Sequence, residues 1–170
     1  MGAALRAGVI GLGAMGRHHV RVLREIDGVD VVAVADPAGD PYRVAGARDV
    51  LPDVEALIAA GIDMAVVAVP TKFHEQVALT LAAAGVHTLV EKPIAVDTDA
   101  GARLVAAFDA AGLVGAVGHI ERFNPAIQNL RKRLEAGELG DLYQVATRRQ
   151  GPFPNRIADV GVVKDLASHD

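Results

Sequence analysis

Two residues near the end of the sequence, Asp165 and His169, carry side chains that can take up and release protons. They lie four positions apart in GVVKDLASHD, and on a helix this spacing puts both side chains on one face. Such a pair is either the polar face of a small protein's last helix or one half of an active site. The residues that precede it decide between these two interpretations.

A glycine-rich segment near the start, GLGAMG, has the G-x-G-x-x-G spacing typical of dinucleotide-binding loops. Gly11 would allow a tight turn, Gly13 would let a pyrophosphate approach the backbone, and Gly16 would let the following helix pack on the strand. We also expect cofactor contacts from the residues between these glycines, Leu12, Ala14 and Met15. The alternative is a glycine-rich turn that binds no ligand.

Asp36 lies 20 residues after Gly16, at the end of the second apolar run. A carboxylate at this place accepts hydrogen bonds from the ribose hydroxyls of adenosine and repels a 2′-phosphate. Asp36 therefore favours NAD over NADP, while Arg43, a cation within reach of a phosphate, keeps NADP open. The other interpretation of Asp36 is an ordinary turn acid before Pro37.

The segment VEKPIA puts Glu91 and Lys92 at the end of another apolar run, where open α/β sheets bind their ligands. A solvated strand end is the alternative interpretation of this charged pair. The loop after the preceding run would face the nicotinamide half of a cofactor, and its candidate contacts are Pro70, Thr71 and His74. His74 is equally well explained as a residue of the first turn of a helix.

Composition narrows the class of protein. The 170 residues are 51% hydrophobic, carry a formal net charge of -4 and include no cysteine. The mild acidity argues against nucleic acid or a membrane surface as the partner, and the absence of cysteine excludes thiolate nucleophiles and cysteine metal sites. No metal-binding cluster of histidines is apparent. The glycine loop follows so closely on the first residues that we expect no signal peptide, and hence a soluble cytoplasmic protein.

The elements that must position these residues alternate along the chain. Valine-rich apolar runs at 7–13, 29–36, 63–70, 86–93 and 113–119 read as strands buried on both faces, with helical patterns between them. The first helix would present Met15, His19, Val22, Leu23 and Ile26 to the core. This alternation predicts an α/β fold, a doubly wound parallel sheet.

After residue 119 the pattern changes. A helix with Asn124 as N-cap, Pro125 in its first turn and Gly137 after its end is followed by a polar-alternating strand at 141–150 and a last helix at 158–169. We therefore place one domain at 1–120 and the beginning of a second domain at 121–170.

Several of these segments, taken in order, resemble the Gfo/Idh/MocA family of sugar-type oxidoreductases across essentially the whole chain: the glycine loop with GRHH, VPTKFHEQVA, EKPIA, GHIERFNPA and DLASHD. The resemblance implies an NAD(P)-binding Rossmann domain at 1–120. It also implies that 121–170 begins an incomplete α/β substrate domain, whose open sheet commonly forms the interface of a homo-oligomer. Within the family, the motifs are most similar to the UDP-N-acetylglucosamine 3-dehydrogenase branch.

The resemblance also implies roles for three residues around the hydroxyl of a sugar or nucleotide-sugar substrate. His169 would be the base, since imidazole titrates near neutral pH, and Lys92 would hydrogen-bond the same oxygen. Asp165 would orient the imidazole or hold a neighbouring hydroxyl. The alternative function is a truncated or degenerate dinucleotide-binding module without turnover of its own.

Overall fold

The computed structural model describes residues 2–146 and 148 of the 170-residue chain. The chain divides into two compact units, with the division between Gly118 and His119. Asp165 and His169, and the helix expected at 158–169, lie outside the described residues. The domain boundary after residue 120 stays a prediction.

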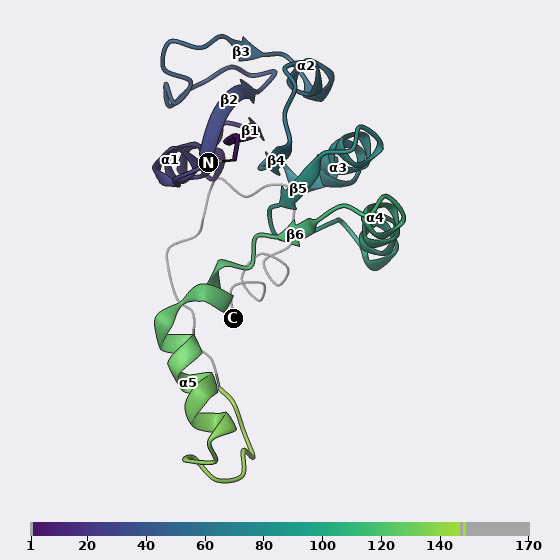
Figure 1. Ribbon diagram of the computed structural model, residues 1–170. Coiled ribbons are helices and arrows are strands. Elements are labelled where there is room, and N and C mark those ends of the chain that lie inside the picture. Colours follow the sequence, from purple (N-terminus) through teal and green to yellow (C-terminus); the bar gives the residue numbers. More distant parts are fainter. Residues whose placement is uncertain (1, 147, 149–170) are drawn as a thin grey trace. The chain divides into compact units, whose positions relative to one another are not determined.

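The first unit is built on one parallel sheet of six strands in the order β3-β2-β1-β4-β5-β6 (Figure 1). The chain order reverses between β1 and β4, which is where doubly wound sheets bind ligands. The doubly wound parallel sheet expected from the sequence is therefore confirmed. The strands are β1 (Leu5–Ile10), β2 (Val29–Ala35), β3 (Val50–Leu51), β4 (Met64–Val67), β5 (His87–Val90) and β6 (Gly115–Val117).

Helices cover both faces of this sheet. Helix α1 lies on one face, and α2, α3 and α4 lie side by side on the other (Figure 1). Asp53 and Asp97 cap α2 and α4 by accepting hydrogen bonds from backbone amides of the first turn. The helices of this unit are α1 (Gly16–Glu25), α2 (Val54–Ala59), α3 (His74–Ala83) and α4 (Thr98–Ala110), and the short 3-10 helix η1 (Thr71–Phe73) precedes α3.

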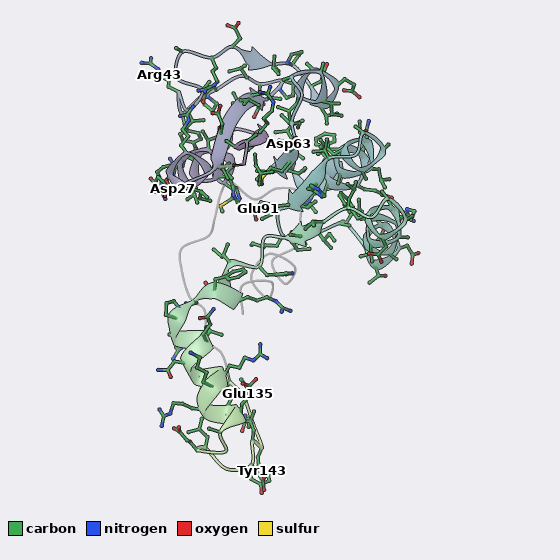
Figure 2. All side chains as sticks on the ribbon, viewed as in Figure 1. Asp27, Arg43, Asp63, Glu91, Glu135 and Tyr143 are labelled. Atoms are coloured by element: carbon green, nitrogen blue, oxygen red, sulfur yellow. The ribbon has the colours of Figure 1, made fainter. Side chains whose placement is uncertain are left out.

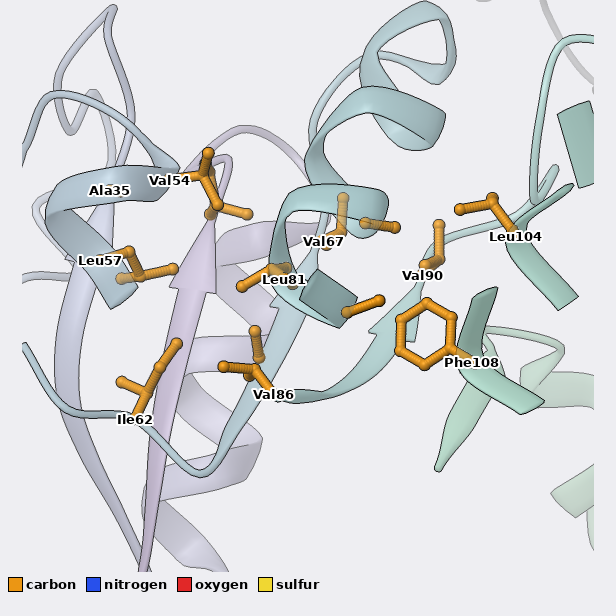
Figure 3. Close-up of a cluster of buried hydrophobic side chains, with 14 of the residues drawn as sticks. Ala35, Val54, Leu57, Ile62, Val67, Leu81, Val86, Val90, Leu104 and Phe108 are labelled. Carbon is orange, nitrogen blue, oxygen red and sulfur yellow. The ribbon is translucent and has the colours of Figure 1, made fainter. Parts of the chain in front are cut away.

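The core has two parts because successive strand residues point to opposite faces. On β1, Ala7 and Val9 pack towards α1, whereas Ile10 packs towards α2 and α3. Figure 3 shows the second part, where Leu57 of α2 and Leu81 of α3 meet strand residues such as Val67. Burial on both faces explains why these strands read as continuous apolar runs.

The buried face of α1 differs from the expected one. Val20 and Leu23 are buried, whereas Val22, Met15 and Ile26 are 37–46% exposed. The reason is that Gly16 fixes the rotation of the helix by packing under the glycine loop, and positions four and seven residues later share its face.

The second unit contains η2 (Ile120–Phe123) and α5 (Pro125–Glu135). Asn124 caps α5 through a hydrogen bond from the Ala126 amide to its side chain, and Gly137 has the positive φ of 72° expected after a helix. The strand expected at 141–150 is wrong for its described residues, 141–146 and 148, which form none. A strand needs a partner for its backbone groups, and the described part of this unit supplies none. No helix in the described part of the chain is long and apolar enough to cross a membrane.

Candidate functional site

The candidate residues of the first unit gather at the carboxyl edge of the sheet. Because β1, β2, β4 and β5 run parallel, the loops that follow them lie at the same edge. Backbone hydrogen bonds continue the ladder into these loops, from the Gly11 amide to the Ala35 carbonyl at 2.8 Å and from the Glu91 amide to the Val67 carbonyl at 2.9 Å. The glycine loop, Asp36 and Lys92, far apart in the sequence, thus belong to one rim.

The three glycines of the loop have different surroundings. Gly11 has a φ of 89°, and a Cβ on it would lie 2.5 Å from the Ala68 carbonyl oxygen; a Cβ on Gly16 would lie 1.7 Å from the Gly11 oxygen. Gly16 therefore packs against the loop's own carbonyl, and only loosely, at 3.7 Å, against the Ala68 side chain after β4. A Cβ on Gly13 would meet no atom within 4 Å. Gly11 and Gly16 are thus required by the fold, whereas Gly13 borders open space.

Asp36 is bound to the glycine loop. Its Oδ2 accepts a hydrogen bond of 2.7 Å from the Leu12 amide, and its Oδ1 accepts one of 2.8 Å from the Ala38 amide. The carboxylate is half-buried, and each oxygen retains lone-pair capacity beyond its one backbone donor. The Leu12 side chain is fully buried in the α1 part of the core. The pair of bonds fixes the acid beside the loop without using up its capacity to accept ribose hydroxyls.

The loop between β2 and β3 carries Arg43, the cation closest in sequence to Asp36. Burial opposes ionisation of Asp40, but backbone amides, first that of Ala45, hold the pKa of its carboxyl below the ordinary value. The Arg17 guanidinium lies 4.5 Å from the centroid of the Tyr42 ring, which ties this loop to α1. Arg43 is exposed on the same loop (Figure 2).

Glu91 is a buried carboxylate at the other end of the rim, with 5% of the residue exposed. His19 of α1 places Nε2 2.6 Å from its Oε1, and the Lys92 amide donates to its Oε2 at 3.1 Å. Burial raises the pKa of Glu91, but the hydrogen bond and charge of His19, with the amide and charge of Lys92, hold the pKa below its ordinary value. A buried, ionised carboxylate is thus held between α1 and the end of β5.

His74 is almost fully buried at the start of α3. Its Nε2 lies 2.9 Å from the Val69 carbonyl oxygen and its Nδ1 lies 2.9 Å from the Pro93 carbonyl oxygen. Both partners are acceptors, so a ring with one proton donates to one of them at a time. Because both nitrogens face the backbone, His74 fits a supporting role better than direct contact with a cofactor.

The structure brings together the glycine loop, Asp36, and the residues after β4 and β5, while Asp165 and His169 lie outside the described residues. Thr71 is buried, Pro70 is exposed, and Lys92, Ala14 and Gly13 are half-buried. His19 was expected on the apolar face of the first helix, either packed there or near the phosphates of a cofactor, and its bond to Glu91 was not expected. The available signal was that a buried carboxylate needs a partner, and that α1 starts at the same rim. Among the described residues, no group of three or more His, Asp or Glu side chains could hold a metal ion.

Comparison with known proteins adds independent findings. Residues 5–119 match the sequence model of the Gfo/Idh/MocA group, described as an oxidoreductase family with the NAD-binding Rossmann fold. The chain is 36% identical over 169 residues to the UDP-N-acetylglucosamine 3-dehydrogenase of Acidithiobacillus ferrooxidans, covering 98% of this chain and 52% of that protein. It is 34% identical over 163 residues to an inositol 2-dehydrogenase of Corynebacterium glutamicum, covering 89% of this chain and 47% of that one.

A solved structure gives the same fold with ligands. The WlbA dehydrogenase of Bordetella pertussis, in complex with NADH and UDP-GlcNAcA, superposes with a TM-score of 0.76 at 29% identity, covering 83% of this chain and 42% of that one. The chain thus spans about half the length of the curated relatives it matches, 52% and 47% of the two above.

Proposed function

The chain belongs to the Gfo/Idh/MocA oxidoreductase family with the NAD-binding Rossmann fold, and on this premise we propose that it provides the cofactor half of a sugar dehydrogenase. The reaction would transfer hydride between a nicotinamide and a secondary hydroxyl of a sugar or nucleotide sugar. A compound like UDP-N-acetylglucosamine is the favoured substrate, because the relative named above with 36% identity is a UDP-N-acetylglucosamine 3-dehydrogenase.

The residues at the rim fit the dinucleotide. The open space beside Gly13 leaves room for a pyrophosphate next to the loop backbone, and α1 begins at Gly16 with its amide end towards that loop. Asp36 would accept the ribose hydroxyls, and its negative charge disfavours a 2′-phosphate. NAD is the cofactor of this family, and when bound it supplies the acceptor for the substrate's hydride.

The protein's own groups would handle the proton of the hydroxyl. His169 would accept it, and Lys92 would donate a hydrogen bond to the same oxygen and stabilise the negative charge that develops there. Asp165 would orient the His169 ring or hold a neighbouring sugar hydroxyl. The roles of all three residues are proposals that rest on the family motifs.

One observation carries the proposal. The first turn of α1, which follows the glycine loop, and the strand end that carries Lys92 are joined by the 2.6 Å hydrogen bond between His19 and Glu91. A cofactor held at the loop and a hydroxyl held at Lys92 would therefore share one rim of one rigid sheet. Hydride transfer needs such a fixed arrangement of the reacting groups.

The experiment is a turnover assay on the product of the complete gene. NAD would be supplied with UDP-N-acetylglucosamine, myo-inositol or scyllo-inositol, and the formation of NADH would be followed by its absorbance. The assay would be repeated at several pH values. We expect oxidation of the nucleotide sugar, and a loss of about 100-fold or more in kcat for Lys92→Ala, because the developing charge loses its stabilising donor.

The matched control is Lys132→Ala, which removes an exposed lysine of α5 and should leave turnover unchanged. Cofactor binding without oxidation of any of these substrates would contradict the proposal and favour a dinucleotide-binding module. Homo-oligomerisation of the gene product and a cytoplasmic location stay predictions.

A further inference from the structure

Lys92 lies between two residues that are each held by a histidine. The side chain of Glu91 bonds to His19 of α1 at 2.6 Å, and the carbonyl of Pro93 lies 2.9 Å from Nδ1 of His74 of α3. The two helices cover opposite faces of the sheet. The backbone around Lys92 is therefore fixed from both faces by side chains more than 15 positions away in the sequence.

The bond to His19 acts on the backbone of Lys92 as well as on Glu91. One carboxylate oxygen faces His19, and the other accepts the amide of Lys92 at 3.1 Å. A Cβ on Gly118 would lie 3.2 Å from Oε2 of Glu91, so the carboxylate is packed closely under that glycine. Glu91 thus has little room to move. Because its carboxylate bonds both His19 of α1 and the Lys92 amide, the place of α1 on the sheet fixes where the Lys92 peptide lies.

The contacts of His74 fix the other side. Its ring reaches the Val69 carbonyl after β4 and the Pro93 carbonyl after β5, so it joins two neighbouring loops of the rim. Only 1% of the residue is exposed, which leaves no surface for a substrate. The ring is therefore part of the framework and acts on the site through Pro93.

We propose that His19 and His74 are positioning residues for Lys92, holding the residues on its two sides so that its ammonium group meets the reacting hydroxyl. The inference rests on the proposed function of Lys92. In this role His19 and His74 act by restricting where the backbone of Lys92 lies. A displacement of about 1 Å at a reacting group can cost 100-fold in rate.

The first test compares His19→Gln, His19→Leu and His74→Gln with His18→Gln in the complete gene product. His18 is the exposed neighbour on α1 and serves as the matched control. We expect kcat to fall about tenfold or more in His19→Leu and His74→Gln, with KM and the Kd of NADH within about twofold of the unmodified protein. His19→Gln keeps a donor near Glu91 and should recover part of the loss, and His18→Gln should match the unmodified protein.

The second readout is the pH profile of kcat, which a merely structural histidine would not shift. Among the described residues, the charged groups that act on Glu91 are His19 on α1 and the adjacent Lys92. Without His19, Glu91 loses the hydrogen bond and the charge that lower its pKa, so the pKa of Glu91 rises and the carboxylate protonates at higher pH. Because His169 would set the acidic limb of the unmodified protein, protonation of Glu91 should appear as a further loss of kcat at acidic pH in His19→Leu, a smaller one in His19→Gln, and none in His18→Gln.

The outcomes separate this inference from the function on which it rests. If Lys92→Ala abolishes turnover while the His19 and His74 variants keep both the kcat and the pH profile of His18→Gln, the positioning role is wrong and the function stands. If the losses appear only in KM or NADH affinity, the positioning role is likewise wrong. If Lys92→Ala itself turns over normally, both proposals fall. Melting temperatures identify any variant that does not fold. If His19→Leu does not fold, the kcat and pH profile of His19→Gln, which keeps a hydrogen-bond donor near Glu91, decide whether His19 positions Lys92.

Discussion

The two ends of the rim are built from different parts of the chain. At the β1 end, the cofactor loop is shaped by backbone: two close glycine contacts, an open glycine, and the Leu12 amide bonded to Asp36. At the β5 end, the peptide of Lys92 is held by side chains, His19 through Glu91 and His74 through Pro93. The first end uses residues within one local motif and its acid, whereas the second needs two helices that cover opposite faces.

The difference teaches what each end can tolerate. At the β1 end, adding a side chain to a closely packed glycine should destabilise the loop, because the added atoms would overlap the backbone. At the β5 end, removing a histidine side chain should be destabilising, because the buried Glu91 carboxylate or the Pro93 carbonyl then loses its hydrogen-bond partner. The predictions below test this contrast.

The largest effect is expected from the matched pair Gly16→Ala and Gly13→Ala. Both add one methyl group, but at Gly16 it would lie 1.7 Å from the Gly11 oxygen, whereas at Gly13 it would meet no protein atom within 4 Å. We expect Gly16→Ala to lower the free energy of unfolding by roughly 1–3 kcal/mol, or more, and to remove NADH binding.

Gly13→Ala should fold like the unmodified chain and weaken NADH binding about tenfold, because its methyl group would occupy the space proposed for the pyrophosphate. Thermal melting and NADH fluorescence titration measure both quantities. Equal melting temperatures for the two variants would mean that Gly16 is not needed by the fold, and unchanged NADH affinity in Gly13→Ala would place the ligand elsewhere.

The contrast also explains what the sequence could reveal. The glycine spacing and Asp36 predicted the β1 end because they form one known pattern, a strand, a glycine turn and a helix start with an acid about 20 residues further on. His19 and His74 could not be assigned in this way, since no such pattern specifies their partners Glu91 and Pro93, which depend on how the helices pack on the sheet. The same limit explains why Val22 was expected in the core: the rotation of α1 is set by the contact of Gly16, which periodicity alone does not contain.

Two other elements show the same dependence on tertiary partners. The strand β3 is only two residues long and was not predicted, because its pairing with β2 rather than its own pattern defines it. Conversely, the alternating residues from 141 onwards form no strand in the described part of the chain, where no partner is available. The fold of the first unit was predictable because strands that are buried on both faces of a parallel sheet are continuous apolar runs, which can be recognised from the sequence alone.

A smaller effect is expected at Asp36, whose charge is proposed to set the affinity and selectivity for the cofactor at the β1 end. Asp36→Ser replaces the charged carboxylate that accepts the ribose hydroxyls by a shorter, neutral hydroxyl and removes the repulsion of a 2′-phosphate, so NADH affinity should fall about tenfold and the preference over NADPH should shrink. Asp109→Asn, an exposed position on α4, is the control. Titration with both nucleotides measures the ratio, and an unchanged preference would mean that Asp36 does not select the cofactor.

The smallest effect concerns the acid dependence of stability at the β5 end. The pKa of Glu91 is lowered in the folded chain, so its ionised form stabilises the fold above the ordinary carboxyl range, and this contribution is lost as the pH falls through the folded value. Glu91→Gln should cost about 1 kcal/mol near neutral pH, and the difference should shrink towards acidic pH.

Urea unfolding of the unmodified chain and of Glu91→Gln at several pH values measures the difference in their free energies of unfolding. Glu55→Gln, at an exposed position on α2, is the control. A difference that stays constant from neutral to acidic pH would show that Glu91 does not contribute through its charge, and the side-chain-built end would need another explanation.

The most direct test of the central claim, that both ends form one NAD site, follows backbone amides of the 170-residue chain in a 1H–15N spectrum during titration with NADH. We expect the amides of Gly13 and Lys92 to shift along one saturation curve, while the amide of Gly137, beyond the end of α5, stays in place. A shift at Gly13 with Lys92 unmoved, or no shift of either at millimolar NADH, would contradict it.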